Sequence, residues 1–307
     1  MKLRTELKIE ASDRQISHNH TLLLIGSCFS DNIGDLLSRS GFKIEHNPFG
    51  TVYNAASIYK QLCYGYKAQP LDEQLFAYNE NDGLHRHYDF HSSFNATSKA
   101  DLLQNIGRGA QKFTDLGQPS CCIITLGTSW VYQLKSAVFL VANCHKMPDT
   151  YFDKQFLSLE DTVDVLQKII GLLQGTRCIF TVSPVRHLKD GLVENARSKA
   201  VLLEAVHRIC VQGLAEYFPA YELVIDDLRD YRFYEDDLLH PSRLAVEYIW
   251  DKFCDRYMGE ETKALVRKYN KLHQMMSHRP FHPDGEAYQK HLAKIEDLKR
   301  EIESSRS

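Results

Sequence analysis

The sequence lacks the long hydrophobic runs of a membrane protein. None of its apolar stretches approaches the roughly 18 residues that a helix needs to cross a bilayer. The first ten residues alternate charged and apolar side chains and contain no apolar run of signal-peptide length. We therefore expect neither secretion nor membrane insertion.

An excess of charge of one sign is also missing. The chain of 307 residues carries 37 Lys and Arg against 40 Asp and Glu, a formal net charge of −3. Such a balance creates no field that would gather a polyanion, so binding to nucleic acid or to an anionic membrane surface has no general electrostatic support. The expected partner is small or neutral.

The cysteines lack the spacing of a metal or disulfide framework. No two of them form a Cys-x-x-Cys pair, which argues against a cysteine-based zinc knuckle. They scatter through apolar stretches, as reduced thiols of a cytoplasmic protein do. They stand at positions 28, 63, 121, 122, 144, 178, 210 and 254.

The hydrophobic pattern predicts alternating strands and helices. Short apolar runs bounded by turn residues predict buried strands at 21–25, 121–126, 178–182 and 222–225. Amphipathic spacing predicts helices at 31–40, 55–64, 99–116, 159–173, 194–217 and 243–257. This alternation is typical of an α/β fold with a mostly parallel sheet covered on both faces. Ligands bind beyond the carboxyl ends of such strands, so the residues that follow each run are the candidates for chemistry.

Three segments depart from that pattern. Residues 74–95 and 131–145, rich in Tyr, His and Phe, are expected to form inserted strands or ribbons. The charged tail from 259 contains a helix breaker at 279–283. Its last segment has the spacing of an amphipathic helix, which predicts packing on the body or on a second copy, and hence a possible homo-oligomer; a solvated helical tail is the alternative. The residues with that spacing are Tyr288, Leu292, Ile295 and Ile302.

The first predicted strand leads into Gly26-Ser27-Cys28-Phe29-Ser30, where a helix opens. A nucleophile on such a turn is stabilised as an anion by the helix N-terminus and by its own backbone N–H. Ser27 and Cys28 are both candidates. A cysteine in this position, beside a histidine, is expected to have a pKa below its ordinary value.

Asp237 and His240 form the second candidate pair, just ahead of the last predicted helix. An Asp three residues before a His reaches back to the imidazole and fixes its tautomer. The second ring nitrogen is then free to act as a general base.

Together these motifs resemble the GSCFA group of bacterial proteins, which is similar to the SGNH or GDSL-type ester hydrolases. The resemblance covers roughly residues 15 to 257. It implies a three-layer sandwich with a five-stranded sheet of flavodoxin-like order over 1–257. Residues 258–307 would then form a helical C-terminal extension.

The resemblance also implies roles for individual residues. In register with Gly-Asp-Ser-Leu-Ser, Cys28 falls on the nucleophile and Ser27 on the Asp, while Asp237 and His240 match the last motif. The oxyanion donors are expected to come from the second and third motifs. These donors are the Gly50 N–H, Ser129 in the place of the usual Asn, and Thr128 as its substitute.

The resemblance implies an acyl-ester hydrolase or acyltransferase that needs no cofactor. Its substrate would be a small-molecule or glycan ester, with O-acylated carbohydrate as the substrate class. Whether Cys28 or Ser27 is the nucleophile stays open. The rival hypothesis is a non-catalytic carbohydrate-binding module on the same scaffold; retention of both Asp237 and His240 argues against it.

A second histidine-rich segment, His85-Arg86-His87-Tyr88-Asp89-Phe90-His91, offers a different chemistry. On a strand its odd-numbered residues share one face, as metal ligands require. It is similar to the His-x-His-x-Asp-His motif of metallo-β-lactamase-like hydrolases except for the inserted Phe90. A metal-dependent hydrolase using His85, His87 and His91 is therefore an alternative. The favoured interpretation has no bound metal, and the stripe, with His87 and His91, lines the acyl pocket or an exposed ribbon.

The loop after the strand at 178–182 points at the same cleft. Arg186 or His187 there is a candidate for binding an anionic group of the substrate. Asn195 and Lys199 follow at helical spacing, and for these two a solvated helix face is the favoured interpretation.

Overall fold

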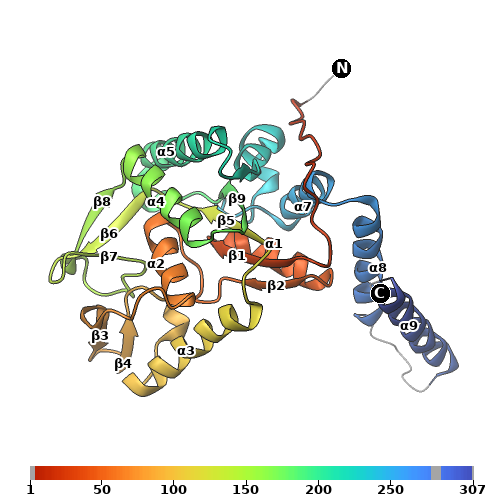
Figure 1. Ribbon diagram of the computed structural model, residues 1–307, viewed down its shortest axis with the longest axis horizontal. Helices are drawn as coiled ribbons and strands as arrows, with labels where there is room; N and C mark the ends of the chain where they lie inside the picture. The colour runs from red at the N-terminus through yellow and green to blue at the C-terminus, as the bar shows by residue number, and fades with distance from the viewer. Residues whose placement is uncertain (1–3, 278–284, 306–307) are drawn as a thin grey trace.

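The computed structural model describes residues 4–277 and 285–305, and its centre is a five-stranded, all-parallel sheet (Figure 1). The strand order is β10-β9-β5-β1-β2. This is the flavodoxin-like order, so the predicted fold class is confirmed. The strands are β1 (Thr21–Gly26), β2 (Lys43–His46), β5 (Cys121–Leu126), β9 (Arg177–Val182) and β10 (Glu216–Tyr217).

Helices cover both faces of this sheet. Helices α1 (Cys28–Arg39) and α7 (Arg243–Tyr257) pack on one face. The other face is covered by α2 (Ala55–Gly65), α3 (Lys99–Leu116), α4 (Leu159–Leu172) and α5 (Gly191–Val211). Along β1, Leu22 and Leu24 pack on the side of α1 and α7, whereas Leu23 and Ile25 pack on the side of α2, α3, α4 and α5. All four are fully buried, as expected for a central parallel strand.

The predicted strand at 222–225 is wrong. The chain there forms a short helix, α6 (Ala220–Glu222), and a π-helical segment (Leu223–Leu228). Leu223 and Val224 are buried among the side chains of α1 and α7. A run of three apolar residues, Leu223-Val224-Ile225, does not distinguish a buried strand from a buried helical turn. The edge strands of the sheet are instead β2 and β10, which have no apolar run.

The two aromatic segments form antiparallel ribbons, as predicted. Strands β3 (Phe76–Asn79) and β4 (Leu84–His87) pair in one, and β6 (Trp130–Leu134) pairs with β7 (Phe139–Val141) and β8 (Phe152–Phe156) in the other. Both lie at the end of the molecule away from α7 (Figure 1). Short 3-10 helices occur at Glu73–Leu75, Ser92–Phe94, Asp149–Tyr151, Leu188–Asp190 and Tyr231–Phe233.

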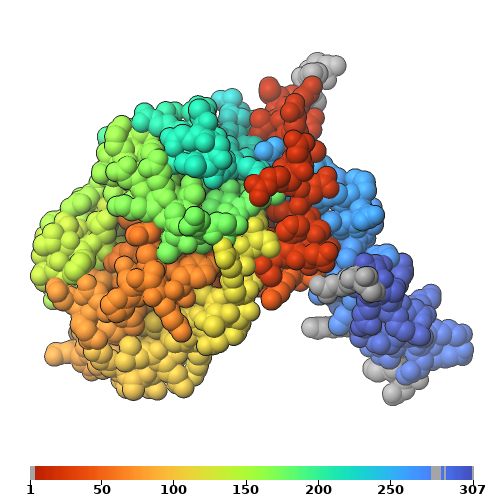
Figure 2. Space-filling view, viewed as in Figure 1, coloured from red at the N-terminus to blue at the C-terminus, as the bar shows by residue number. Residues whose placement is uncertain are grey.

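The C-terminal helices α8 (Glu260–Met276) and α9 (Glu286–Ser304) form a lobe that projects from the body (Figure 2). Ile295, Leu298 and Ile302 of α9 pack against Leu265 and Leu272 of α8, so the amphipathic face is covered by the same chain. The predicted helix breaker at 279–283 lies outside the described residues. Within the parts of the chain that the structure describes, no helix is long and apolar enough to cross a membrane.

Candidate functional site

The candidate site begins where β1 ends, at the point where the strand order reverses. Gly26 pairs with Thr125 of β5, and the N–H of Ser27 donates to the Thr125 carbonyl at 3.2 Å. Gly26 has a φ of +141°, and a Cβ on it would lie 2.1 Å from the same carbonyl oxygen. Only glycine fits this approach, which fixes the next two residues at the carboxyl edge of the sheet.

Ser27 and Cys28 occupy different environments. Ser27 is fully buried, and its hydroxyl caps α1 by accepting a hydrogen bond from the N–H of Phe29 at 3.3 Å. Cys28 is the first residue of α1 and is partly exposed. Of the two candidates, Cys28 is therefore the one that a substrate can reach.

The environment of Cys28 raises the pKa of its thiol, contrary to the expected lowering. Burial is the main cause, and the carboxylate of Asp31 is the second. The backbone N–H groups of Cys28 and Phe29 and the charge of Lys199 act in the opposite direction. Because the raising effects win, the resting group is a neutral thiol that needs a base.

The predicted partnership of Asp237 and His240 is formed. Asp237 Oδ2 lies 2.6 Å from His240 Nδ1, and its Oδ1 accepts from the backbone N–H groups of Leu239 and His240 at 2.8 and 3.0 Å. These bonds lower the pKa of Asp237 to about 2, those from His240 contributing most. Both side chains are close to half exposed. The carboxylate therefore holds the ring in one orientation at the surface.

The loop that follows β9 connects the two halves of the site. The N–H of Arg186 donates to the carbonyl of Leu239 at 3.3 Å, beside His240. Burial lowers the pKa of His187 to about 4, with smaller contributions from Lys199 and His240. The structure shows no hydrogen bond between the His240 ring, whose Nδ1 is paired with Asp237, and Cys28.

Two of the three predicted oxyanion donors, Gly50 and Ser129, already donate hydrogen bonds within the protein. The N–H of Gly50 donates to the Asn47 carbonyl at 2.8 Å, closing the turn after β2. Ser129 is fully buried, and its hydroxyl donates to the Ser198 carbonyl at 3.0 Å. The Thr128 hydroxyl accepts from the N–H of Trp130 at 3.1 Å and lies 3.1 Å from the Ser198 hydroxyl, where either group can donate. The three groups hold loops in place, and their role as oxyanion donors stays a prediction.

The histidine stripe is a packing element, and His85, His87 and His91 do not come together as the metal-site alternative requires. His87 is buried against the rings of Phe76 and Phe90, with centroids 4.7 and 4.9 Å away. Burial lowers its pKa to about 3. Asp89 is fully buried and pairs with Lys60. Nowhere in residues 4–277 and 285–305 do three His, Cys, Asp or Glu side chains come together as a metal site.

The remaining histidines of the stripe diverge. His85 lies against the ring of Tyr78, at 4.8 Å between centroids. His91 pairs with the Ser93 hydroxyl at 3.0 Å and lies beside Gly50, where a Cβ would meet its side chain at 2.2 Å. The expectation that the stripe lines an acyl pocket is therefore wrong for the buried His87.

Asn195 and Lys199 are buried, contrary to the expected solvated face. Asn195 Oδ1 accepts from the N–H of His187 at 3.0 Å. Lys199 Nζ donates to the carbonyls of Gly127 and Ser183, each at 2.7 Å. A signal was present in the sequence: residues 195, 199, 202 and 206 follow a helical spacing that continues the apolar face of α5.

Arg186 lies at the edge of the site between two tyrosines. Its guanidinium carbon is 4.4 Å from the ring centroid of Tyr234 and 5.2 Å from that of Tyr231. It donates to the Tyr234 hydroxyl at 3.0 Å. Among the described residues it has no acidic partner.

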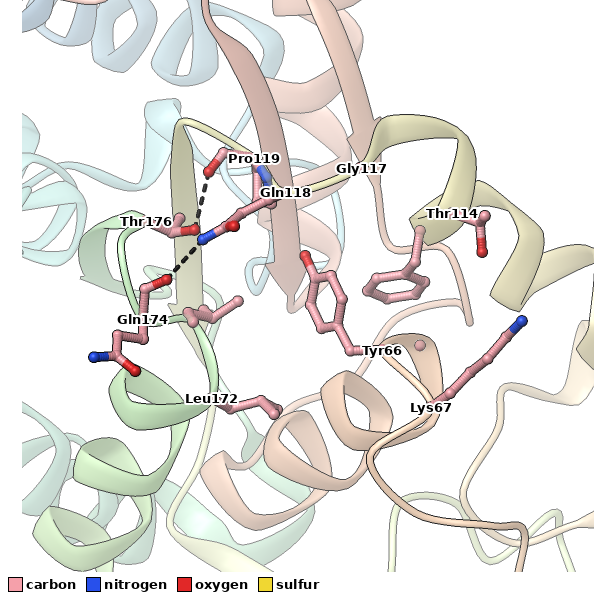
Figure 3. A pocket seen from close by; sticks show the side chains of 12 residues that line it. Tyr66, Lys67, Thr114, Gly117, Gln118, Pro119, Leu172, Gln174 and Thr176 are labelled. Atoms are coloured by element: carbon pink, nitrogen blue, oxygen red, sulfur yellow. Dashed lines mark hydrogen bonds between the residues drawn. The ribbon is translucent and has the colours of Figure 1, made fainter.

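A well-formed cavity of about 450 Å³ lies at the other end of the sheet (Figure 3). Its wall includes Pro119 and Thr176, which precede β5 and β9, and the ring of Tyr66. Gln118 and Thr176 close one side through hydrogen bonds to the carbonyls of Gln174 and Pro119 at 2.6 and 2.9 Å. This cavity is at the amino ends of the strands, so it is separate from the Cys28 site.

Fold and site together define an α/β protein of flavodoxin-like topology with an Asp-x-x-His pair at the carboxyl edge of its sheet. The chain belongs to the GSCFA family, whose model matches residues 21–253. A second model, the C-terminal domain of GSCFA domain proteins, matches residues 269–305, which the resemblance seen in the sequence did not explain. Neither the curated proteins nor the solved structures gave a match.

Proposed function

We propose that this chain hydrolyses or transfers an acyl group, with Cys28 as nucleophile, His240 as base and then acid, and Asp237 as the residue that orients the ring. The observation that carries the proposal is the Asp237–His240 hydrogen bond of 2.6 Å at the edge of the sheet where α1 begins with Cys28. An Asp–His pair that only contributed to packing would have no need to be exposed or to keep its second ring nitrogen free, as this pair does.

In the proposed reaction, His240 Nε2 takes the proton from the Cys28 thiol. The thiolate attacks the ester carbonyl, the C–O bond breaks, and the leaving alcohol takes the proton back from His240. Water or an acceptor hydroxyl then attacks the thioester, and Cys28 is regenerated. Catalytic hydrogen bonds are often long or absent without substrate, so substrate binding is expected to bring the exposed His240 ring onto the thiol.

The N-terminus of α1 supports the negative charge of this reaction. The backbone N–H groups of Cys28 and Phe29 act on the thiol in the direction that favours the anion. We expect the same helix terminus to favour the oxyanion. The Gly50 and Ser129 donors take part only if substrate binding releases them from their present partners.

We assign the substrate to O-acyl esters of carbohydrate, from the family resemblance. Two features support an extended polar ligand: Tyr231 is 61% exposed, and Arg186 stacks on it without an acidic partner. We also place the protein in the cytoplasm, because all eight cysteines are free thiols.

Trapping the acyl group tests this proposal. The protein is mixed with a generic aryl ester, quenched in acid, and mapped by mass spectrometry. We expect an acyl adduct on the peptide that contains Cys28, and its loss in Cys28→Ala. Ser27→Ala should keep the adduct and lose about 1 kcal/mol of stability, because it removes a helix cap. Cys210→Ala is the matched control, since this half-buried thiol on α5 has a pKa raised to about 11 by burial.

The carbohydrate-binding module is the second candidate because Gly50 and Ser129 already donate elsewhere and the pKa of Cys28 is raised. It predicts binding of glycans with no adduct and no turnover of any ester tested, in both the unmodified protein and Cys28→Ala. An adduct confined to Cys28 excludes it.

A further inference from the structure

Lys199 is a buried cation that has no carboxylate partner among the described residues. Its side chain extends from α5 and is 1% exposed. The two groups that Nζ contacts by hydrogen bonds, the carbonyls of Gly127 and Ser183, are neutral and directly follow β5 and β9. A buried ammonium with only neutral partners costs free energy, so such a site needs a reason to keep its charge.

Cys28 and Lys199 Nζ lie at the same edge of the sheet, because Cys28 follows β1 and the Gly127 carbonyl that Nζ contacts follows the neighbouring strand β5. Cys28 is also the group that favours the charge of Lys199. Burial lowers the pKa of Lys199 to about 7, and the Cys28 thiolate opposes that shift. In return, the Lys199 charge favours the thiolate of Cys28. An ammonium has three N–H donors, and the two carbonyls take two of them. One donor is therefore left for an anion.

Other titratable groups face this pair. Asp31, on α1, raises the pKa of Cys28. The Tyr53 phenol interacts with Cys28 from the loop after β2, and burial keeps its pKa above the ordinary value. His187 interacts with Lys199 from the loop after β9, and its lowered pKa leaves it neutral. Lys199 is thus the cation that acts on the thiol from a buried position.

We infer that Lys199 is a positioning residue of the proposed acyl transfer, whose buried ammonium balances the negative charge that forms at Cys28. The inference rests on the proposed function. When His240 removes the thiol proton, the thiolate forms near a cation whose own partners already hold it in place. The same two hydrogen bonds tie the β5 and β9 loops together next to the thiol.

The test measures the reactivity of Cys28 without any ester substrate. Alkylation by iodoacetamide is followed by peptide mapping from pH 6 to 10 in the unmodified protein, Lys199→Met, Lys199→Arg and Lys168→Met. In Lys199→Met we expect Cys28 to react about tenfold more slowly at pH 7.5 and its midpoint to rise by about one unit. Lys199→Arg keeps the charge and should stay within about threefold. Lys168→Met removes an exposed lysine of α4 and should change nothing.

A second measurement covers the case in which Lys199→Met does not fold. NMR of isotope-labelled lysine follows the titration of Lys199 in the unmodified protein and in Cys28→Asp, which places a permanent negative charge where the thiolate would form. This charge should raise the Lys199 midpoint by about half a unit or more. Equal midpoints, or an unchanged alkylation profile in folded Lys199→Met, overturn the inference.

The two proposals fail in different ways. If Cys28 and Lys199 titrate together but the protein turns over no ester, the charge pair is supported and the proposed function is excluded. If ester turnover depends on Cys28 but has the same pH profile in Lys199→Met as in the unmodified protein, the proposed function is supported and Lys199 has no role in it.

Discussion

The chain contains two Asp- and His-rich segments, and the structure treats them in opposite ways. In the stripe on β4 and the loop after it, Asp89 and His87 are buried, and Asp89 is paired with Lys60. In the loop before α7, Asp237 and His240 are close to half exposed and paired with each other. The residue types are the same, but only the second segment holds its Asp and His paired with each other at the surface.

The difference lies in where each segment joins the fold. The stripe belongs to an inserted ribbon, where its polar groups replace hydrophobic packing and anchor the ribbon to α2. The Asp237–His240 loop opens α7 at the carboxyl edge of the sheet, where side chains face a ligand crevice. Position relative to the strand ends therefore separates a structural polar cluster from a chemical one.

The largest expected effect comes from breaking the buried pair. Lys60→Met removes the cation that contacts Asp89 Oδ1 at 2.7 Å. The fully buried Asp89 carboxyl then keeps the hydrogen bond from the Tyr64 hydroxyl but loses its paired cation. We expect a loss of about 3–5 kcal/mol of unfolding free energy, measured by urea denaturation. Lys99→Met, which breaks the exposed pair with Glu73, should cost less than about 1 kcal/mol.

Adding Asp89→Asn to Lys60→Met should restore part of that loss, because the buried charge is then gone. Equal costs for Lys60→Met and Lys99→Met would show that Asp89 is not held as an ion, and the contrast between the two segments would be lost.

The exposed pair should respond in activity and hardly in stability. Asp237→Asn keeps an oxygen for the backbone N–H groups of Leu239 and His240 but no longer fixes the imidazole tautomer. We expect kcat on an aryl ester to fall about a hundredfold. This is less than the roughly 10⁴-fold loss known for a buried triad carboxylate, because the pair is solvated. The neighbouring Asp236→Asn is the control, and an equal loss there would remove Asp237 from the mechanism.

The fold was largely predictable because most of its elements carry an apolar pattern. The central strands and six large helices were recognised from apolar spacing. The edge strand β2 was missed because Lys43–His46 is polar and half exposed. The edge strand β10, Glu216–Tyr217, is only two residues long and was wrongly predicted as the end of the helix at 194–217, which stops at Val211. The segment at 222–225 was misassigned because its burial comes from contacts with α1 and α7, which a local pattern does not contain.

The pH dependence of stability should report on the buried histidine. His87 has a pKa of about 3 in the folded protein and an ordinary value in the unfolded chain. Between these values only the unfolded chain binds the proton, so stability falls as the pH falls from about 6.5 towards 3. We expect His87 to account for a loss of about 2 kcal/mol between pH 7.5 and pH 5.

His87→Phe should therefore show a smaller loss of stability over that range, measured by urea denaturation at each pH. His145 and His187, whose pKa values are also lowered to about 4, keep part of the slope in both proteins. An unchanged slope in His87→Phe would contradict the assignment of His87 as a neutral packing residue.

The site was predictable only where a motif fixes local geometry. The Asp237–His240 turn follows from a three-residue spacing, and its hydrogen bonds are formed within the loop itself. The oxyanion donors stay a prediction, because sequence gives the position of Gly50 and Ser129 but not the partners that their polar groups already have. Lys199 was missed because a long charged residue on a helix is normally solvated, and here tertiary carbonyls replace the water.

The smallest expected effect concerns the charge of the substrate, which Arg186 would contact at the edge of the site. The Arg186 guanidinium is held by the Tyr234 hydroxyl and by two rings, and no acid among the described residues neutralises it. Arg186→Gln should raise KM about tenfold for an ester that carries a carboxylate, the loss of one charged hydrogen bond. KM for an uncharged ester should stay within about twofold. Arg232→Gln, where the arginine already pairs with Asp230, is the matched control. Equal increases for both esters in Arg186→Gln would assign Arg186 to holding the loop, because a structural change weakens every substrate alike.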